Sequence, residues 1–285
     1  MTPRIDAHQH FWHPARGDYG WLSADLPICR PFGPADLAPH LRNCRIDGTL
    51  LVQAAPTLGE TEYLLGIADA TSIVRGVVGW VDFDDPGNRA TMERLGAHPK
   101  LKGFRPMIQD LPDDRWMLRT ELRWAFDALE ALDLVFDALV FPRHLDHLLH
   151  LLQRHPALVS VIDHGAKPNI HGHAFDDWAA AMTRLARETS TCCKLSGLAT
   201  EAGPNWTVAE LRPYVDHLLE TFGPDRLIFG SDWPVATLAT DYEDWVAAVE
   251  ALTAGVSAVE RAAIFGATAA RVYRLSLPST SGAGG

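Results

Sequence analysis

Short apolar runs recur along the chain at regular intervals and predict buried β-strands. Each run has the length of a strand and is bounded by polar, glycine or proline residues. In most cases successive runs begin ~25–35 residues apart, which is the length of one strand and one helix. The eight predicted strands cover residues 4–11, 48–54, 76–83, 101–107, 134–140, 158–164, 191–197 and 226–232.

The segments between these runs carry the periodicity of amphipathic helices. In residues 120–132 the apolar positions fall three and four residues apart, so they share one face. Thr207 and Glu210 have capping-box spacing, which predicts a helix that begins there and extends to about residue 222. Residues 142–155, 174–187 and 241–252 predict three further helices.

Strands that alternate with helices build a parallel sheet. Eight such units predict an α/β fold, the (β/α)8 TIM barrel, as a single domain over residues 1–275 of the 285. An open doubly wound sheet is the competing architecture, but the first predicted strand is not followed by a glycine-rich phosphate loop. We expect residues 12–47 to form a loop over the C-terminal end of the first strand. The low-complexity residues 276–285 are expected to form a disordered tail.

The composition argues against several classes of partner. The formal net charge is −11, so neither nucleic acid nor an anionic membrane surface is expected. No apolar run reaches the ~20 residues of a membrane-spanning helix, and the first residues, MTPRID, differ from a secretory signal peptide. The four cysteines have the spacing of neither a disulfide framework nor a metal site, which predicts reduced thiols in a cytoplasmic protein.

Chemically reactive side chains gather where the predicted strands end. In a barrel of this type the C-terminal strand ends and the loops after them form the active site. His8 and His10 share one face of the first strand with Asp6, because side chains alternate along a strand. A barrel core is normally apolar, so polar residues at many separate strand ends predict a functional site. The later strand ends carry Gln53, Arg105, Asp137, His164, Ser196 and Asp232.

Three of these histidines and one aspartate suit metal-assisted hydrolysis. The set of His8, His10, His164 and Asp232 can hold one divalent ion such as Zn²⁺ and leave a position open for water. The ion would lower the pKa of that water and polarise a carbonyl group. Asp232 is then a ligand, a general base, or both in turn. Arg105 either binds a carboxylate, a ring oxygen or hydroxyl groups through its planar fork, or forms a structural ion pair with Asp110 or Asp113.

Five segments of the chain resemble a known family. They are DAHQHFW at residues 6–12, GFRPMIQD at 103–110, DHGAKP at 163–168, KLSGL at 194–198 and FGSDWP at 229–234. Together they resemble the amidohydrolase superfamily, in particular its amidohydrolase 2 branch of metal-dependent hydrolases. Within that branch the chain looks most like the sugar-lactonase group that contains L-fuconolactonase and L-rhamnonolactonase. The resemblance implies hydrolysis of a sugar-acid lactone to the free acid, a reaction of carbohydrate catabolism.

The resemblance also implies roles for individual residues. It assigns the metal site to His8, His10, His164 and Asp232, with His10, His164 and Asp232 also catalytic and Asp232 as the general base. Binuclear members of the superfamily carry a carboxylated lysine on the fourth strand and a histidine on the fifth. Here the corresponding strands offer Arg105 and Asp137. We therefore expect one divalent ion, zinc by preference, or a metal-free site.

The expected partner is a small sugar lactone, and its binding residues are expected around this group. Trp233 and other tryptophans near the first strand either stack on the sugar ring or pack in the core. His171 either contacts substrate or lies in a solvated loop. The identity of the lactone, its ring size and the choice between monomer and homodimer stay open. The expected substrate-binding residues are Arg105, Gln53, Asp137, Ser196, Trp233 and His171.

Two other functions stay open beside lactone hydrolysis. One is metal-dependent decarboxylation of an aromatic or enoic acid, which uses the same histidine and aspartate set on the same fold, with Arg105 on the substrate carboxylate. The other is a non-catalytic barrel that binds a sugar acid or a metal as a sensor. The substitution Asp232→Asn separates enzyme from sensor, because only an enzyme loses its rate while it keeps its ligand.

Overall fold

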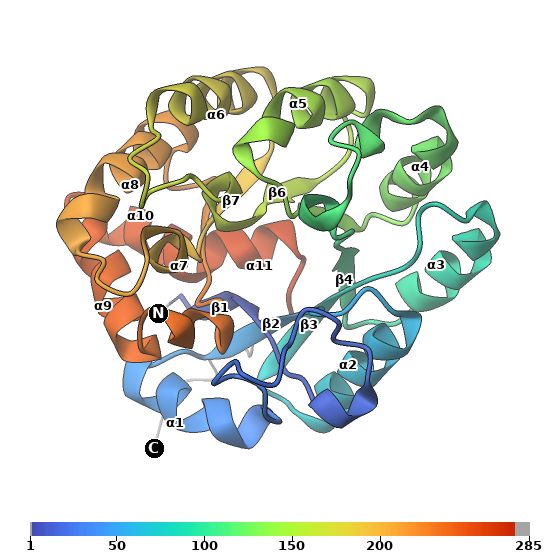
Figure 1. Ribbon diagram of the computed structural model, residues 1–285, viewed down its shortest axis with the longest axis horizontal. Helices are drawn as coiled ribbons and strands as arrows, with labels where there is room; N and C mark the ends of the chain where they lie inside the picture. Colours follow the sequence, from blue (N-terminus) through green and yellow to red (C-terminus); the bar gives the residue numbers. More distant parts are fainter. Residues whose placement is uncertain (1, 277–285) are drawn as a thin grey trace, which may run out of the picture.

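The computed structural model describes residues 2–276 and contains eight parallel strands that pair in sequence order (Figure 1). Helices surround them, which confirms the predicted single (β/α)8 barrel. The strands are β1 (Ile5–Gln9), β2 (Gly48–Val52), β3 (Val74–Gly79), β4 (Leu101–Phe104), β5 (Val135–Ala138), β6 (Ser160–Ile162), β7 (Cys192–Leu195) and β8 (Leu227–Phe229).

The barrel closes just beyond the last strand, at the end where the predicted site lies. Asp232 donates its backbone N–H to the carbonyl of His8 at 2.7 Å, and His10 donates to the carbonyl of Trp233 at 2.7 Å. Two expected site residues, His10 and Asp232, are therefore held side by side by the main chain.

All eight strands lie where the apolar runs predicted them, but each ends two to four residues earlier than predicted. The chain leaves the sheet where the polar residues begin. As a result Gln53, Arg105, His164 and Asp232 follow strands rather than end them.

Asp6 does not share a face with the two histidines, contrary to the simple alternation. The register of β1 against β2 shifts between Asp6 and Gln9, where three steps along β1 match two along β2. This irregularity turns Asp6 away from the cavity. Its carboxylate accepts hydrogen bonds from the Ser231 hydroxyl at 2.6 Å and from the Tyr242 hydroxyl at 3.0 Å.

The helices that the sequence predicted are all present. Thr207 caps α8 as expected: Glu210 donates its N–H to the Thr207 hydroxyl at 3.3 Å, and Thr207 donates its N–H to the Glu210 carboxylate at 2.8 Å. The α-helices are α1 (Pro34–Cys44), α2 (Leu58–Ala70), α3 (Arg89–Gly96), α4 (Arg123–Ala131), α5 (Leu145–Arg154), α6 (Asp176–Glu188), α7 (Leu198–Ala202), α8 (Val208–Phe222), α9 (Tyr242–Leu252), α10 (Ala258–Ala262) and α11 (Thr268–Val272). None of the helices within residues 2–276 has both the length and the apolar character that a bilayer span requires.

The expectation of a loop throughout residues 12–47 is wrong in part, because α1 occupies residues 34–44. Pro34 sits in the first turn, where its missing N–H is harmless, and Asp36 accepts from the Gly33 N–H at 2.9 Å. Before α1 the chain does form a loop, which Trp12 and Phe32 close through two backbone hydrogen bonds of 3.1 and 2.9 Å. Of the predicted tail, residues 277–285 lie outside the described residues.

Two apolar clusters hold the barrel together. The larger one fills the space between strands and helices, where for example Phe136 of β5 packs edge-to-face on Phe126 of α4. Side chains alternate along a strand, so the neighbours of Phe136 face the barrel interior. There Val135 joins Val161, and Tyr273 packs against them from the segment after α11.

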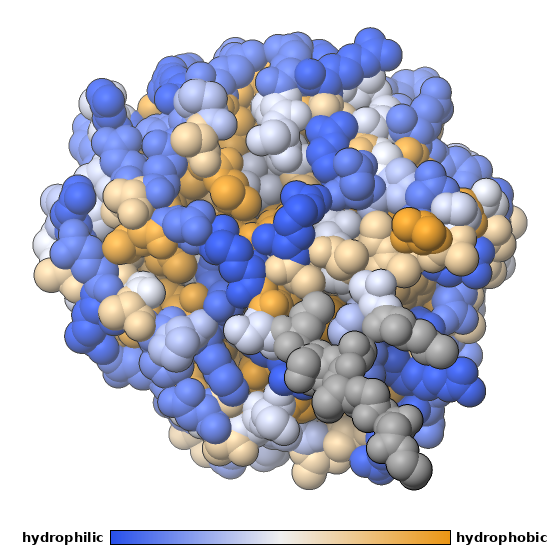
Figure 2. Space-filling view, turned by 180° about the vertical axis from the view of Figure 1, so that it is seen from behind, coloured by the Kyte–Doolittle hydropathy of each residue, from blue (hydrophilic) through white to orange (hydrophobic). Residues whose placement is uncertain are grey.

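Exposed large apolar side chains are few. The reverse face mixes hydrophilic residues, mostly around its rim, with hydrophobic patches nearer the middle (Figure 2). Among residues 2–276 the exposed large hydrophobic residues are Trp21, Leu238 and Val259. Trp21 and Leu238 both lie at the cavity described next.

Candidate active site

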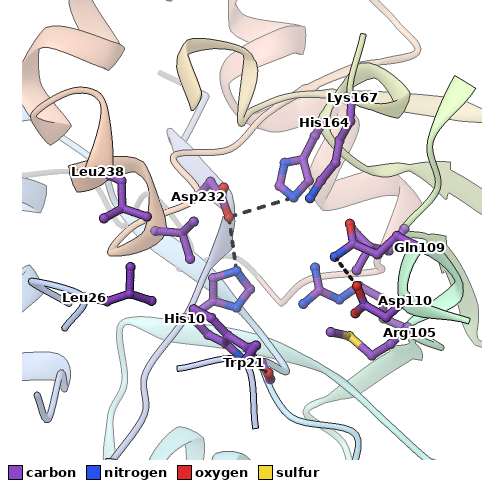
Figure 3. Close-up of a pocket in the computed structure, with 14 residues that line it drawn as sticks. His10, Trp21, Leu26, Arg105, Gln109, Asp110, His164, Lys167, Asp232 and Leu238 are labelled. Carbon is purple, nitrogen blue, oxygen red and sulfur yellow. Dashed lines mark hydrogen bonds and ion pairs between the residues drawn. The ribbon is translucent and has the colours of Figure 1, made fainter. Parts of the chain in front are cut away.

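A cavity of about 290 Å³ opens at the C-terminal end of the barrel (Figure 3). One side is polar and carries His10, Arg105, His164 and Asp232 from the ends of β1, β4, β6 and β8. The other walls carry Trp21, Leu26, Ala54, Met107, Gln109, Asp110, Leu139, Lys167, Val235 and Leu238. The structure thus brings the strand-end residues together as the barrel prediction requires.

His164 and Asp232 reach the cavity through unusual backbone conformations. Both are left-handed, with φ of 54° for His164 and 59° for Asp232. Residues other than glycine adopt this region at a cost, and such strain concentrates at functional sites. The turn lets each side chain point inward directly after a buried strand.

The carboxylate of Asp232 lies at the centre of three imidazoles. Its Oδ1 atom is 3.2 Å from Nε2 of His10, 3.7 Å from Nε2 of His8 and 3.8 Å from Nε2 of His164. The rings of His8 and His164 lie 4.4 Å apart between centroids. All four side chains are almost fully buried.

The Nδ1 atom of each imidazole points away from Asp232 and contacts a buried polar group. His10 donates from Nδ1 to the carbonyl of Val52 at 2.8 Å, and Nδ1 of His164 lies 2.8 Å from the Ser196 hydroxyl. Nδ1 of His8 lies 3.3 Å from Oδ1 of Asp163. The carbonyl of Val52 can only accept, so Nδ1 of His10 carries a proton, and Nε2 of each of the three rings faces Oδ1 of Asp232.

Burial and charge set the protonation states. Burial lowers the pKa of His164 to about 4 and holds the pKa of His8 well below its ordinary value. For Asp232 burial alone would raise the pKa, but His164, His10 and His8 together hold it below its ordinary value. Near neutral pH the imidazoles of His8 and His164 are therefore neutral and the carboxylate of Asp232 is ionised.

This donor set fits a divalent metal ion. Three imidazole nitrogens and a carboxylate oxygen converge, and a cation between such ligand atoms stabilises the group. Ligand bonds of about 2.0–2.2 Å in a tetrahedral site place ligand atoms somewhat over 3 Å apart. The distances of 3.2 and 3.7 Å from Asp232 to His10 and His8 are of that size. His8, His10 and Asp232 form one group of adjacent ligand atoms, and His8, Asp163 and His164 form another.

Arg105 adds a fixed positive charge beside the imidazoles. Its Nη1 donates to Nε2 of His8 at 3.2 Å and to Oδ2 of Asp163 at 3.3 Å. Its Nη2 donates to the Gln53 carbonyl, while the Gln53 amide donates to the Arg105 carbonyl at 2.7 Å. The guanidinium is therefore rigidly placed at the edge of the cavity.

A buried ion network that the sequence did not reveal lies beneath the site. Nζ of Lys194 is 2.5 Å from Oδ2 of Asp137, 2.9 Å from Oδ1 of Asp163 and 3.2 Å from Nδ1 of His8. Tyr273 donates to the other oxygen of Asp137 at 2.8 Å. Burial opposes charge on Lys194, but Asp137 and Asp163 raise its pKa. A lysine inside an apolar strand is a signal that could have been used, because a buried charge needs a buried partner.

Of the six expected substrate-binding residues, only Arg105 lines the cavity. Gln53 and Ser196 lie behind it and hold Arg105 and His164. Asp137 is fully buried and pairs with Lys194. Trp233 packs against Phe11 and Phe32 in the core, and His171 is exposed on a loop where it donates its N–H to the Glu201 carbonyl. Lys167, three residues after His164, is a cavity residue that the sequence did not single out.

This chain is similar in sequence, along nearly its whole length, to a protein family and to enzymes of known activity. A family model described as amidohydrolase matches residues 5–275. An L-fucono-1,5-lactonase from Burkholderia ambifaria is 46% identical over 284 residues, with 98% of each chain covered. An L-fucono-1,5-lactonase from Burkholderia multivorans is 37% identical over 293 residues, with 97% of each chain covered.

One solved structure is similar to this chain in both fold and sequence. It is an amidohydrolase from Burkholderia multivorans with bound zinc, 38% identical to this chain. The TM-score is 0.89, and the match covers 96% of this chain and 100% of the other.

Proposed function

The chain belongs to the amidohydrolase family, and on that premise we propose that it opens a sugar-acid lactone to the free acid. The observation that carries the proposal is the carboxylate of Asp232, whose Oδ1 lies 3.2, 3.7 and 3.8 Å from Nε2 of three imidazoles, with the guanidinium of Arg105 at the edge of the same cavity. The relatives at 46% and 37% identity are both L-fucono-1,5-lactonases, which supports a lactone ester of that class as the substrate.

Asp232 acts as the proton acceptor. A water molecule held among the imidazoles adds its oxygen to the lactone carbonyl carbon, and the carboxylate takes the proton released in that step. The ring C–O bond then breaks, and the same proton passes to the departing alkoxide oxygen. The products are the hydroxy acid and a regenerated carboxylate, so no further reagent is consumed.

Arg105 stabilises the negative charge that develops on the carbonyl oxygen. Its charge does not depend on pH, and Gln53 and Asp163 hold its orientation. Because the donors are already in place, little reorganisation is needed when the tetrahedral intermediate forms.

The remaining walls suit a sugar ring. Gln109, Asp110 and Lys167 offer donors and acceptors to ring hydroxyl groups. On the opposite side, Leu26 and Leu238 form an apolar surface, which suits the methyl group of a 6-deoxy sugar.

We propose that His8, His10, His164 and Asp232 hold one zinc ion, since the bound metal in the related amidohydrolase structure is zinc. When bound, such an ion lowers the pKa of a coordinated water and polarises a carbonyl, which suits a proton acceptor as weak as Asp232. Elemental analysis of the purified protein should find one zinc per chain, and His10→Ala should lose it. Metal-stripped protein that keeps its full rate would contradict a catalytic role for the ion.

Hydrolysis itself is tested with L-fucono-1,5-lactone in a pH-stat, against the rate in buffer. Asp232→Asn should lower kcat by at least ~10²-fold, because it removes the proton acceptor but keeps the shape of the side chain. The matched control is Asp177→Asn on the exposed face of α6, which should behave as the wild type. A panel of pentono-, hexono- and 6-deoxyhexono-lactones that the enzyme hydrolyses no faster than buffer would overturn the proposal.

Decarboxylation uses the same residue types, but no feature of residues 2–276 favours it over lactone hydrolysis. Release of CO₂ from an aromatic acid, without acid formation from a lactone, would favour it. We keep the cytoplasm as the proposed location because Cys29, Cys44, Cys192 and Cys193 are all free thiols.

A further inference from the structure

A second cavity adjoins the candidate active site on the same end of the barrel. Its volume is about 530 Å³, and it lies among the loops that follow β1, β2, β3 and β4. The two cavities share one wall, made by Trp21, Met107 and Asp110. A ligand bound at Arg105 and Asp232 could therefore continue past this wall without leaving the protein surface. Trp21 and Asp110 are labelled in Figure 3.

Aromatic side chains form much of the second cavity. Trp116 and Phe83 are buried and stack with ring centroids 6.1 Å apart, and Trp80 is half-buried beside them. The indoles of Trp21 and Trp116 donate to the Ala54 carbonyl at 2.7 Å and to Asp84 at 2.9 Å. Trp80 has no acceptor for its indole N–H within residues 2–276. It thus offers a flat apolar face together with a free donor, a combination that suits a ring that is apolar on one face and carries hydroxyl groups at its edge.

The polar groups of the second cavity are acidic. Asp82 and Asp110 line it and take part in no ion pair among the described residues. Its lining includes no lysine, arginine or histidine. Carboxylates accept hydrogen bonds from hydroxyl groups and repel anions. The chemistry therefore favours a neutral polyhydroxylated ligand over a uronic acid or a phosphorylated sugar.

We propose that this second cavity is a subsite for a neutral sugar ring linked to the lactone, so that the substrates include glycosylated aldonolactones. The inference rests on the proposed lactone hydrolysis, which supplies the first ring. Trp80 packs against the second ring and donates to one of its hydroxyls, while Asp82 accepts from another. The ester chemistry at Asp232 is the same for one ring as for two.

The test compares L-fucono-1,5-lactone with three derivatives that carry a β-D-galactosyl group on one of its ring hydroxyls each. At least one derivative should have a KM about tenfold below that of the parent lactone, since one or two added hydrogen bonds and a packed ring are worth that much. Trp80→Ala should remove this advantage and leave kinetics on the parent lactone unchanged. Trp80→Phe, which keeps the ring but loses the N–H, should remove part of it. A galacturonosyl derivative should show no gain.

Two results would overturn the subsite. One is a wild-type enzyme that hydrolyses the parent lactone but none of the galactosyl derivatives with a lower KM. The other is a Trp80→Ala variant that changes kinetics on one-ring and two-ring lactones equally. If instead the parent lactone itself is not hydrolysed, the proposed function has failed. The subsite is then judged by calorimetry of lactose binding to the wild type and to Trp80→Ala, where equal or absent binding overturns it.

Discussion

Nζ of Lys194 lies 2.9 Å from Oδ1 of Asp163, and both side chains are fully buried beneath the candidate active site. The same carboxylate oxygen is 3.3 Å from Nδ1 of His8. The pair therefore holds the Nδ1 side of the His8 ring, which leaves Nε2 of His8 facing Asp232 and Arg105. Buried charge inside this barrel thus orients a histidine that lies against Asp232.

Lys194→Met should destabilise the protein by about 3–5 kcal/mol, because it leaves Asp137 and Asp163 buried without their shared cation. Urea denaturation followed by circular dichroism measures the change. The control is Lys102→Met on β4, whose half-exposed side chain forms no ion pair among residues 2–276, with an expected change of about 0.5 kcal/mol or less. Similar losses for both lysines would contradict the special role of Lys194.

Ser196→Ala should reduce kcat on the lactone by about tenfold while KM stays nearly constant, because the Ser196 hydroxyl holds Nδ1 of His164 at 2.8 Å. Ser160→Ala is the matched control. Its hydroxyl is also buried and bonds to Thr191 at 2.8 Å, but it lies far from the site at the start of β6. Ser160→Ala should lower stability and leave kcat alone, so equal kcat losses would show that Ser196 acts only through stability.

The buried carboxyl group of Glu60 should make the free energy of unfolding depend on pH. Its carboxyl accepts from the backbone N–H groups of Ala54 and Ala55, and burial raises its pKa to about 7. An acid whose folded pKa exceeds its unfolded value of about 4.5 binds more protons in the folded state between those two pH values. The stability it contributes is therefore full below about pH 4.5 and is lost as the pH rises to about 7.

The size of the effect is up to about 3 kcal/mol for such a shift. Urea denaturation of the wild type and of Glu60→Gln at pH 5 and pH 8 measures it. Relative to Glu60→Gln, which cannot ionise, the wild type should lose stability between the two pH values. A constant difference between the two proteins would show that Glu60 has an ordinary pKa.

The fold was predictable because each βα unit repeats the same local signal. A short apolar run followed by an amphipathic segment identifies a strand and its helix independently of the other units. The bulge in β1 was not predictable in this way, since nothing in Asp6–Gln9 reveals that three residues pair with two. That one shift decides whether Asp6 lies in the cavity or contacts Tyr242.

Only the residues that line the candidate site were predictable from the sequence, and not those that hold them in place. Histidine, arginine and aspartate at strand ends are conspicuous, and a barrel brings strand ends together. Residues such as Ser196 and Gln53 are equally near the strand ends, yet they bond to His164 and Arg105 instead of lining the cavity. Which of two neighbouring polar side chains faces the cavity depends on the local turn, and the turns here include positive φ values at His164 and Asp232.

Gly197 tests how tightly that local geometry positions His164. Its φ is +66°, and a Cβ atom added there would lie 2.7 Å from Nδ1 of His164 and 2.8 Å from its Cγ. Gly197→Ala should therefore cost about 1–2 kcal/mol of stability from the backbone conformation alone. It should also lower kcat by at least tenfold, because the imidazole must move to make room and a displacement near 1 Å costs up to about 10²-fold in rate.

The control is Gly66→Ala in the exposed part of α2, where an added Cβ atom meets nothing within 4 Å. This variant should gain about 0.4–1 kcal/mol of stability and keep the wild-type rate. Stopped-time assays measure kcat of both variants, and urea denaturation measures their stability. A Gly197→Ala enzyme with wild-type kcat would mean that His164 tolerates displacement and has no strict positional role in the reaction.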